Sequence, residues 1–172
     1  MTALGEYIAQ CGINRRRLVR SPFQCPQMGA DIRKERGENM TSTDVVKSLY
    51  AAFGQGDMPT VLNLLHPEVL WCEAEGSPYD SGDGWIGPDA VVENLFAKMG
   101  DDWSVFTVQP SLFHESGSVV TVEGRYAAKH SQTGKEMDCQ VCHVWTTDDG
   151  RITKFQQYVD TAKMQDVMGV NS

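Results

Sequence analysis

The sequence has no long apolar run: its longest stretches of apolar residues are far short of the ~20 that a bilayer-spanning helix needs. It also lacks a leader with a charged start, an apolar middle and a small-residue cleavage site. We therefore expect a cytoplasmic protein that does not enter a membrane. Its five cysteines are an odd number, which fits free thiols better than a set of disulfides.

Basic residues are scarce where a nucleic-acid surface would need them. The net charge is -8, yet residues 1–40 hold seven Lys or Arg against four Asp or Glu, so the rest of the chain is strongly acidic. Clustered Lys and Arg are what binds phosphates, so we expect no nucleic-acid partner. The run Arg15-Arg16-Arg17 is open to two interpretations, a solvated tail or a contact with an anion.

Motifs for nucleotide cofactors are also missing. No phosphate-binding loop, dinucleotide fingerprint or nucleophile elbow occurs in the chain. The run Cys139-Gln-Val-Cys142-His143 does match the spacing of a covalent haem attachment site. On a strand, however, residues 139 and 142 point to opposite faces and cannot hold one group together. We therefore expect two packed thiols, no metal and no cofactor.

Apolar spacing divides the chain into an N-terminal extension (1–40), one domain (41–169) and a short tail (170–172). Residues 1–40 show no sustained apolar period, which is typical of a flexible arm. In the domain, hydroxyl residues at 41–43 cap a helix over 42–53, and Asp57 caps a second helix that ends at His66-Pro67. A strand (69–73), a Gly-rich loop (74–87) and a third helix (90–99) follow.

Four strand-like runs complete the domain, and a short helix is expected over 161–168. The first three runs are 103–113, 118–130 and 135–147, and the last begins after the turn at Asp149-Gly150. Asp160 is placed to cap the terminal helix, an interpretation that we favour over catalysis. Helices gathered on one face of an antiparallel sheet define an α+β domain.

This order of elements resembles one known superfamily, and short motifs carry the same resemblance: Gly87-Pro-Asp-Ala-Val, Gly124-Arg-Tyr, His143-Val-Trp and Gln157-Tyr-Val-Asp-Thr. The chain resembles the nuclear transport factor 2 (NTF2)-like superfamily, and most of all its SnoaL-like, ketosteroid isomerase-related branch. That resemblance implies a cone, in which a curved antiparallel or mixed sheet wraps around about three N-terminal helices and an internal pocket. It also implies a homodimer formed through the outer sheet face, and a small, largely apolar ligand.

The resemblance carries functional positions onto this chain. The general base of the isomerases falls at Glu73, their helix-one tyrosine at Leu49, next to Tyr50, and their second oxyanion donor at Cys142. Related epoxide hydrolases use an arginine and two aspartates, whose positions here hold Gly124, Tyr126 and Gln157. Neither set is complete, so we expect neither steroid isomerisation nor epoxide hydrolysis by those groups.

Alternation along the strands, matched to the family, sorts the pocket from the outer face. We expect Glu73, Tyr126 and Gln157 to be the catalytic set. We expect the pocket to be lined by Tyr50, Trp71, Tyr79, Trp85, Phe96, Trp103, Asp138, Gln140, Cys142, Phe155 and Val159. The expected dimer face contains His143, Trp145 and Tyr158. A slip of one residue in register would exchange the two faces.

Two functions remain open at this stage. Burial of Glu73 among aromatic side chains would raise its pKa into the range useful for proton transfer. The protein would then be a cofactor-independent isomerase, cyclase or lyase that acts on an apolar carbonyl or hydroxyl compound. Alternatively, Glu73 is satisfied by neighbours at the rim, and the domain is a ligand-binding or assembly module without catalysis.

Overall fold

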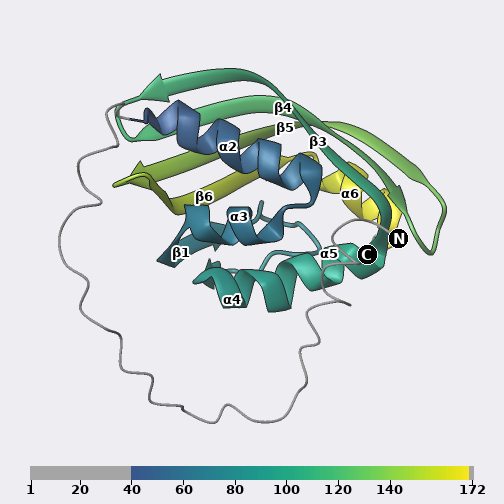
Figure 1. The fold of residues 1–172 in the computed structure, drawn as a ribbon. Helices are drawn as coiled ribbons and strands as arrows, with labels where there is room; N and C mark the ends of the chain where they lie inside the picture. Colours follow the sequence, from purple (N-terminus) through teal and green to yellow (C-terminus); the bar gives the residue numbers. More distant parts are fainter. Residues whose placement is uncertain (1–39, 171–172) are drawn as a thin grey trace, which may run out of the picture.

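The computed structural model describes residues 40–170. In this range a curved six-stranded sheet packs against helices on its concave side (Figure 1). Of the expected divisions of the chain, the N-terminal extension lies outside the described residues, apart from Met40. No helix between residues 40 and 170 is long and apolar enough to cross a membrane.

Helix α2 (Ser42–Gln55) owes both of its ends to local sequence signals. Thr41 accepts a hydrogen bond from the backbone of Asp44, and the Asp44 side chain bonds back to Thr41, which forms a capping box. Gly56 ends the helix in the left-handed conformation, with φ of 69°, which a glycine adopts without strain. Asp57 then caps helix α3 (Met58–Leu64), so two helices follow each other closely.

The third helical stretch is continuous but irregular. It comprises α4 (Pro88–Val91), the π-helical segment η2 (Val92–Phe96) and α5 (Ala97–Asp102). A π-helical turn holds one more residue than an α-helical turn, and here both Leu95 and Phe96 are buried. The sequence predicted this helix but not its π-helical centre.

The sheet is mixed, with strand order β2-β1-β6-β5-β4-β3. Its strands are β1 (Leu65–Cys72), β2 (Trp85–Ile86), β3 (Trp103–Ser116), β4 (Val119–His130), β5 (Glu136–Asp148) and β6 (Arg151–Val159). Only β1 and β6 pair in parallel, and the other neighbours are antiparallel. Helix α6 (Thr161–Met168) follows the last strand and begins at Asp160, whose side chain caps it. The α+β class and the curved mixed sheet are therefore confirmed.

A bulge in β6 decides which face of β5 points inward. Next to the hairpin turn Thr147 pairs with Ile152, but the following pair is Thr146 with Lys154. Thr153 is therefore an extra residue, and its hydroxyl donates to the carbonyl of Thr146 at 3.2 Å. Such a bulge shifts the pairing of β6 with β5 by one residue at all positions beyond it.

The expected faces of β5 were wrong because of this shift. An unbulged hairpin would set Cys142 opposite Gln157, whereas the structure pairs His143 with Gln157 and Cys142 with Tyr158. Directly paired residues share one face of a sheet. His143 and Trp145, expected on the dimer face, are only 4% and 1% exposed and point inward. Three residues expected in the pocket lie on the outer face instead: Asp138, Gln140 and Cys142.

Candidate functional site

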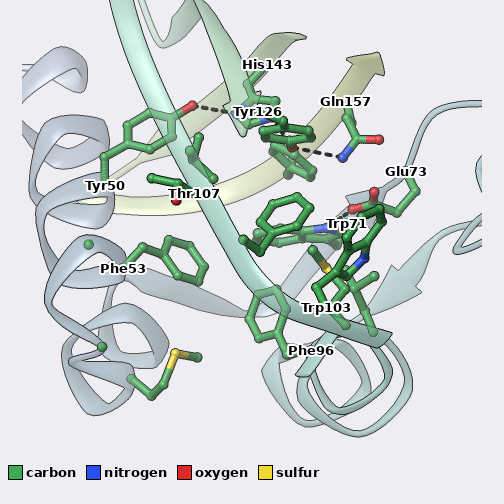
Figure 2. Close-up of a pocket in the computed structure, with 18 of the residues that line it drawn as sticks. Tyr50, Phe53, Trp71, Glu73, Phe96, Trp103, Thr107, Tyr126, His143 and Gln157 are labelled. Carbon is green, nitrogen blue, oxygen red and sulfur yellow. Dashed lines mark hydrogen bonds between the residues drawn. The ribbon is translucent and has the colours of Figure 1, made fainter. Parts of the chain in front are cut away.

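A cavity of about 310 Å³ lies between the concave face of the sheet and the helices (Figure 2). Its wall draws on α2, the start of α3, the η2–α5 stretch and five of the strands. Two residues of the wall, Gly54 at the end of α2 and Thr107 of β3, are exposed. The wall is composed of Tyr50, Phe53, Gly54, Gly56, Met58, Trp71, Glu73, Leu95, Phe96, Met99, Trp103, Phe106, Thr107, Val108, Tyr126, His143, Trp145, Phe155 and Gln157.

Aromatic rings form most of the apolar wall, and Trp71 of β1 lies at their centre. Its ring centroid is 4.1 Å from that of Phe155, and it meets Phe96 and Trp145 edge to face at 5.4 and 5.7 Å. Such contacts stabilise aromatic pairs beyond simple burial. They link rings that come from three strands and a helix into one packed aromatic cluster.

Glu73 is the one carboxyl group among the residues that line the cavity. It follows β1 directly, where the chain leaves the sheet, and it is 7% exposed. Trp71 Nε1 donates to its Oε1 at 2.8 Å. Burial raises the pKa of Glu73 to about 7, although hydrogen bonds from Trp71 and Gln157 oppose the rise. Near neutral pH the group therefore exists in both protonation states.

A second polar cluster crosses the cavity wall next to Glu73. The hydroxyl of Tyr50 lies 2.6 Å from His143 Nδ1, and the hydroxyl of Tyr126 lies 2.7 Å from His143 Nε2. Gln157 Nε2 donates to the Tyr126 hydroxyl at 3.0 Å, and Trp145 Nε1 donates to the Tyr50 hydroxyl at 3.0 Å. Figure 2 shows the tyrosines and Gln157 pointing toward one another from different elements.

These groups are uncharged at neutral pH. Burial without a charged partner lowers the pKa of His143 to about 3, so the imidazole is neutral. Burial likewise raises the pKa of Tyr50 and of Tyr126 well above the ordinary value, so both phenols keep their protons. The cluster can therefore donate and accept hydrogen bonds but supplies no charge.

The structure brings together eight of the residues that the sequence assigned to the site. The three expected catalytic residues, Glu73, Tyr126 and Gln157, all line the cavity, and five expected wall residues join them: Tyr50, Trp71, Phe96, Trp103 and Phe155. Their chemical roles are still predictions. Tyr50 lines the cavity as expected, whereas Leu49, the position that the resemblance matches to the isomerase tyrosine, is fully buried in the core.

Three further residues expected in the pocket do not line it. Tyr79 is buried behind the wall, where its hydroxyl accepts from Trp103 Nε1 at 2.8 Å and donates to Asp102 at 2.9 Å. Trp85 of β2 and Val159 at the end of β6 are half-buried and lie away from the cavity. Trp85 was expected in the wall as an aromatic residue and Val159 by alternation along its strand, and neither signal shows how far along the element the cavity extends.

Sequence reasoning missed several lining residues. His143 and Trp145 were missed because the bulge was not recognised. Phe106, Thr107 and Val108 of β3 were not assigned, although Phe106 and Val108 alternate with the exposed Thr107. The helical residues Phe53, Leu95 and Met99 lie in the helices expected over 42–53 and 90–99, but helical spacing does not show that a cavity separates them from the sheet.

Among residues 40–170, no group of three or more His, Cys, Asp or Glu side chains is placed to hold a metal ion. Cys139 is buried, whereas Cys142 lies half-buried on the opposite face of β5. Burial raises the pKa of both thiols, so neither is a ready nucleophile.

Comparison with known proteins agrees with this architecture. The family model of the SnoaL-like domain matches residues 46–155, so the chain belongs to the SnoaL-like family. An NTF2-like protein of Burkholderia thailandensis is 31% identical, with a TM-score of 0.71 over 74% of this chain and 97% of that one. No protein of the curated set matches the sequence.

Two other solved structures are similar in both sequence and fold. An NTF2-like protein of unknown function from Burkholderia pseudomallei is 29% identical, with a TM-score of 0.66 over 74% of this chain and 96% of that one. TerC, co-crystallised with polyporic acid, is 26% identical, with a TM-score of 0.67 over 74% of this chain and 98% of that one. The fold that the sequence suggested, an NTF2-like cone, is thus confirmed.

Proposed function

We propose that this protein is a cofactor-independent enzyme that transfers a proton on a small apolar carbonyl or hydroxyl compound. One observation carries the proposal: Glu73 is an isolated carboxyl group on the wall of an aromatic cavity, and burial raises its pKa to about 7. A general base or acid is most effective when its pKa is close to the working pH. Glu73 meets that condition chiefly through burial, with a smaller contribution from the charge of Asp80.

The wall also limits the charge of the ligand. None of the residues that line the described cavity is Lys or Arg, and its one histidine is neutral. A carboxylate or phosphate group would lose its hydration there without gaining a cationic partner. We therefore propose a neutral ligand with a flat apolar body that fits between the aromatic rings. Polyporic acid in crystals of the related TerC is consistent with a small-molecule site in this fold.

In the proposed reaction Glu73 both removes a proton from the ligand and returns it. The Glu73 carboxylate removes a proton from a carbon next to the carbonyl of the ligand, and the electron pair of that C–H bond moves to form an enolate. A phenol hydroxyl, from Tyr126 next to Glu73, donates a hydrogen bond to the enolate oxygen. Protonated Glu73 then returns the proton to the same or another carbon. Gln157 holds Tyr126 in place through its amide.

Hydrogen exchange on a model ketone tests the proposal without knowledge of the natural substrate. We would incubate the protein with 2-tetralone, a neutral bicyclic ketone, in D2O and follow loss of its α-proton signals by NMR. The wild-type protein should accelerate the exchange, and Glu73→Gln should reduce this acceleration by about a hundredfold or more, since a general base contributes at least that much.

Glu75→Gln is the matched control, because Glu75 is an exposed glutamate two residues further along the chain. It should exchange 2-tetralone as fast as the wild type. Equal exchange rates in the wild type and in Glu73→Gln would refute the role of Glu73 in catalysis.

The second candidate is a ligand-binding module without turnover. It is favoured by the way in which the polar groups of the wall satisfy one another, Trp71 with Glu73 and Gln157 with Tyr126. A buried polar network of that kind also serves to fix a structure. Binding of 2-tetralone by the wild type without faster exchange would support this candidate over the enzyme.

We further propose that the outer face of the sheet forms a homodimer. Tyr158 of β6 lies on this face and is 58% exposed, and an aromatic side chain in such a position is typical of interfaces. Of the three residues first expected on the dimer face, it is the one that remains there.

A further inference from the structure

His143 is held between two phenols, an arrangement that the proposed proton transfer at Glu73 does not use. Its Nδ1 lies 2.6 Å from the Tyr50 hydroxyl of α2, and its Nε2 lies 2.7 Å from the Tyr126 hydroxyl of β4. Both distances are those of good hydrogen bonds. All three side chains line the cavity, so the row of groups Tyr50-His143-Tyr126 runs along its wall.

Each phenol oxygen also accepts a hydrogen bond from an N–H group whose direction is fixed. Trp145 Nε1, which can only donate, reaches the Tyr50 hydroxyl at 3.0 Å. Gln157 Nε2 reaches the Tyr126 hydroxyl at 3.0 Å. The backbone N–H of Ala74 donates to Gln157 Oε1 at 3.4 Å, which sets the orientation of the amide.

The network contains one more hydrogen-bond donor than its own acceptors can use. A neutral imidazole carries one N–H and one bare nitrogen, so it donates to one phenol and accepts from the other. The phenol that accepts from His143 also accepts from Trp145 or Gln157, and its own proton is then left over. The other phenol donates its proton in a hydrogen bond to the bare nitrogen of His143. One phenol hydroxyl, on either Tyr50 or Tyr126, is therefore free to donate into the cavity.

We propose that His143 is a positioning residue whose tautomer selects which phenol, Tyr50 or Tyr126, donates a hydrogen bond to an acceptor oxygen of the bound ligand. This inference rests on the ligand site proposed above and deepens it. A ligand with one carbonyl oxygen is accepted at either position, because the imidazole changes tautomer to suit. A ligand that places two carbonyl oxygens against both phenols is disfavoured, since only one proton is free.

The tautomer of His143 can be measured directly, without ligand or turnover. Two-bond ¹⁵N–¹H spectra of the imidazole separate a protonated ring nitrogen from a bare one. Tyr50→Phe removes the partner of Nδ1, so the N–H should move to Nε2, where Tyr126 still accepts it. Tyr126→Phe should move it to Nδ1, because an orphaned N–H costs more than an orphaned lone pair. The two variants should therefore show opposite tautomers.

Two controls accompany this experiment. His130 is also buried but bonds to Thr133 outside the network, so its spectrum should be the same in both variants. Tyr79→Phe, which removes a buried hydroxyl behind the wall, should leave His143 as in the wild type. The same tautomer in Tyr50→Phe and Tyr126→Phe, or an imidazolium at pH 7 in the wild type, would overturn the proposal.

Ligand binding supplies the second readout. The wild type should bind 2-tetralone about tenfold more tightly than tetralin, its hydrocarbon counterpart, since one hydrogen bond is worth up to that factor. Each single Tyr→Phe variant should keep this preference, because the remaining phenol takes over, and the double variant should lose it. Loss of the whole preference in one single variant would show that the two phenols do not substitute for each other.

These readouts fail independently of the proposed catalysis. In one outcome Glu73→Gln exchanges 2-tetralone as fast as the wild type, while the two tyrosine variants show opposite tautomers. That result would support selection of the phenol by His143 and refute catalysis by Glu73. If both tyrosine variants show the same tautomer while Glu73→Gln is inactive, selection of the phenol by His143 is refuted and proton transfer by Glu73 is supported.

Discussion

The two faces of strand β5 differ in how their polar side chains are satisfied. On the outer face Asp138 is exposed and forms an ion pair with Arg125 at 2.8 Å, where water competes for both charges. On the inner face His143 and Trp145 are buried, uncharged, and bonded to specific partners at 3.0 Å or less. Changes on the outer face should therefore cost the fold little, whereas positions on the inner face are coupled to one another and to the cavity.

The largest effect should come from charging the inner face. Trp145→Glu removes a fully buried ring and places a carboxylate in an apolar wall, so the free energy of unfolding should fall by about 4 kcal/mol or more. Urea unfolding followed by circular dichroism measures the loss. A variant as stable as the wild type would mean that Trp145 lies on the outside.

Tyr158→Glu is the matched change on the outer face. It should keep the monomer folded, while sedimentation velocity should show that the proposed homodimer dissociates. If the variant sediments as a dimer of unchanged affinity, the interface does not include this part of the sheet.

A smaller effect is expected from removing the buried acid, and it depends on pH. Burial raises the pKa of Glu73 from an ordinary value of 4.5 to about 7, so between these values the folded state holds a proton that the unfolded chain has lost. The contribution of Glu73 to stability is therefore full below pH 4.5 and falls by about 3 kcal/mol as the pH rises through 7. Glu73→Gln lacks this dependence.

The measurement is the difference in free energy of unfolding between Glu73→Gln and the wild type at several pH values. The variant should gain stability relative to the wild type from pH 4.5 to 8 and then level off. A difference that stays constant over this range would mean that Glu73 titrates normally.

The smallest effect should come from the outer ion pair. Arg125→Ala breaks the contact with Asp138, but both side chains are about half exposed or more, so stability should change by about 0.5 kcal/mol or less. Added salt should reduce even that difference. A loss of 2 kcal/mol would show that the outer face is as tightly coupled as the inner one.

Local signals in the sequence were sufficient for most of the fold. The hydroxyl of Thr41, the carboxylates of Asp57 and Asp160, and Gly56 mark helix ends by bonds that span only a few residues. The terminal helix was predicted with the same bounds, Thr161–Met168. Caps of this kind do not depend on the rest of the chain, which is why they can be predicted from it.

The candidate site was harder, because its geometry depends on Thr153, a residue that does not itself line the cavity. Ile152 and Phe155 are both buried, yet they are three residues apart, which strict alternation on a strand does not allow. That spacing was the available signal for the bulge at Thr153. Without it, His143 was assigned to the wrong face, although Glu73, Tyr126 and Gln157 were placed on the cavity side. The π-helical turn had no comparable signal.

The central claim is that Glu73 is a carboxyl group tuned to accept a proton near neutral pH. The most direct test is a ¹³C NMR titration of its side-chain carboxyl in the wild type, with Glu73→Gln used to assign the signal. We predict a midpoint near pH 7, the value to which burial raises its pKa. A midpoint near 4.5, the ordinary value of a glutamate, would contradict the account.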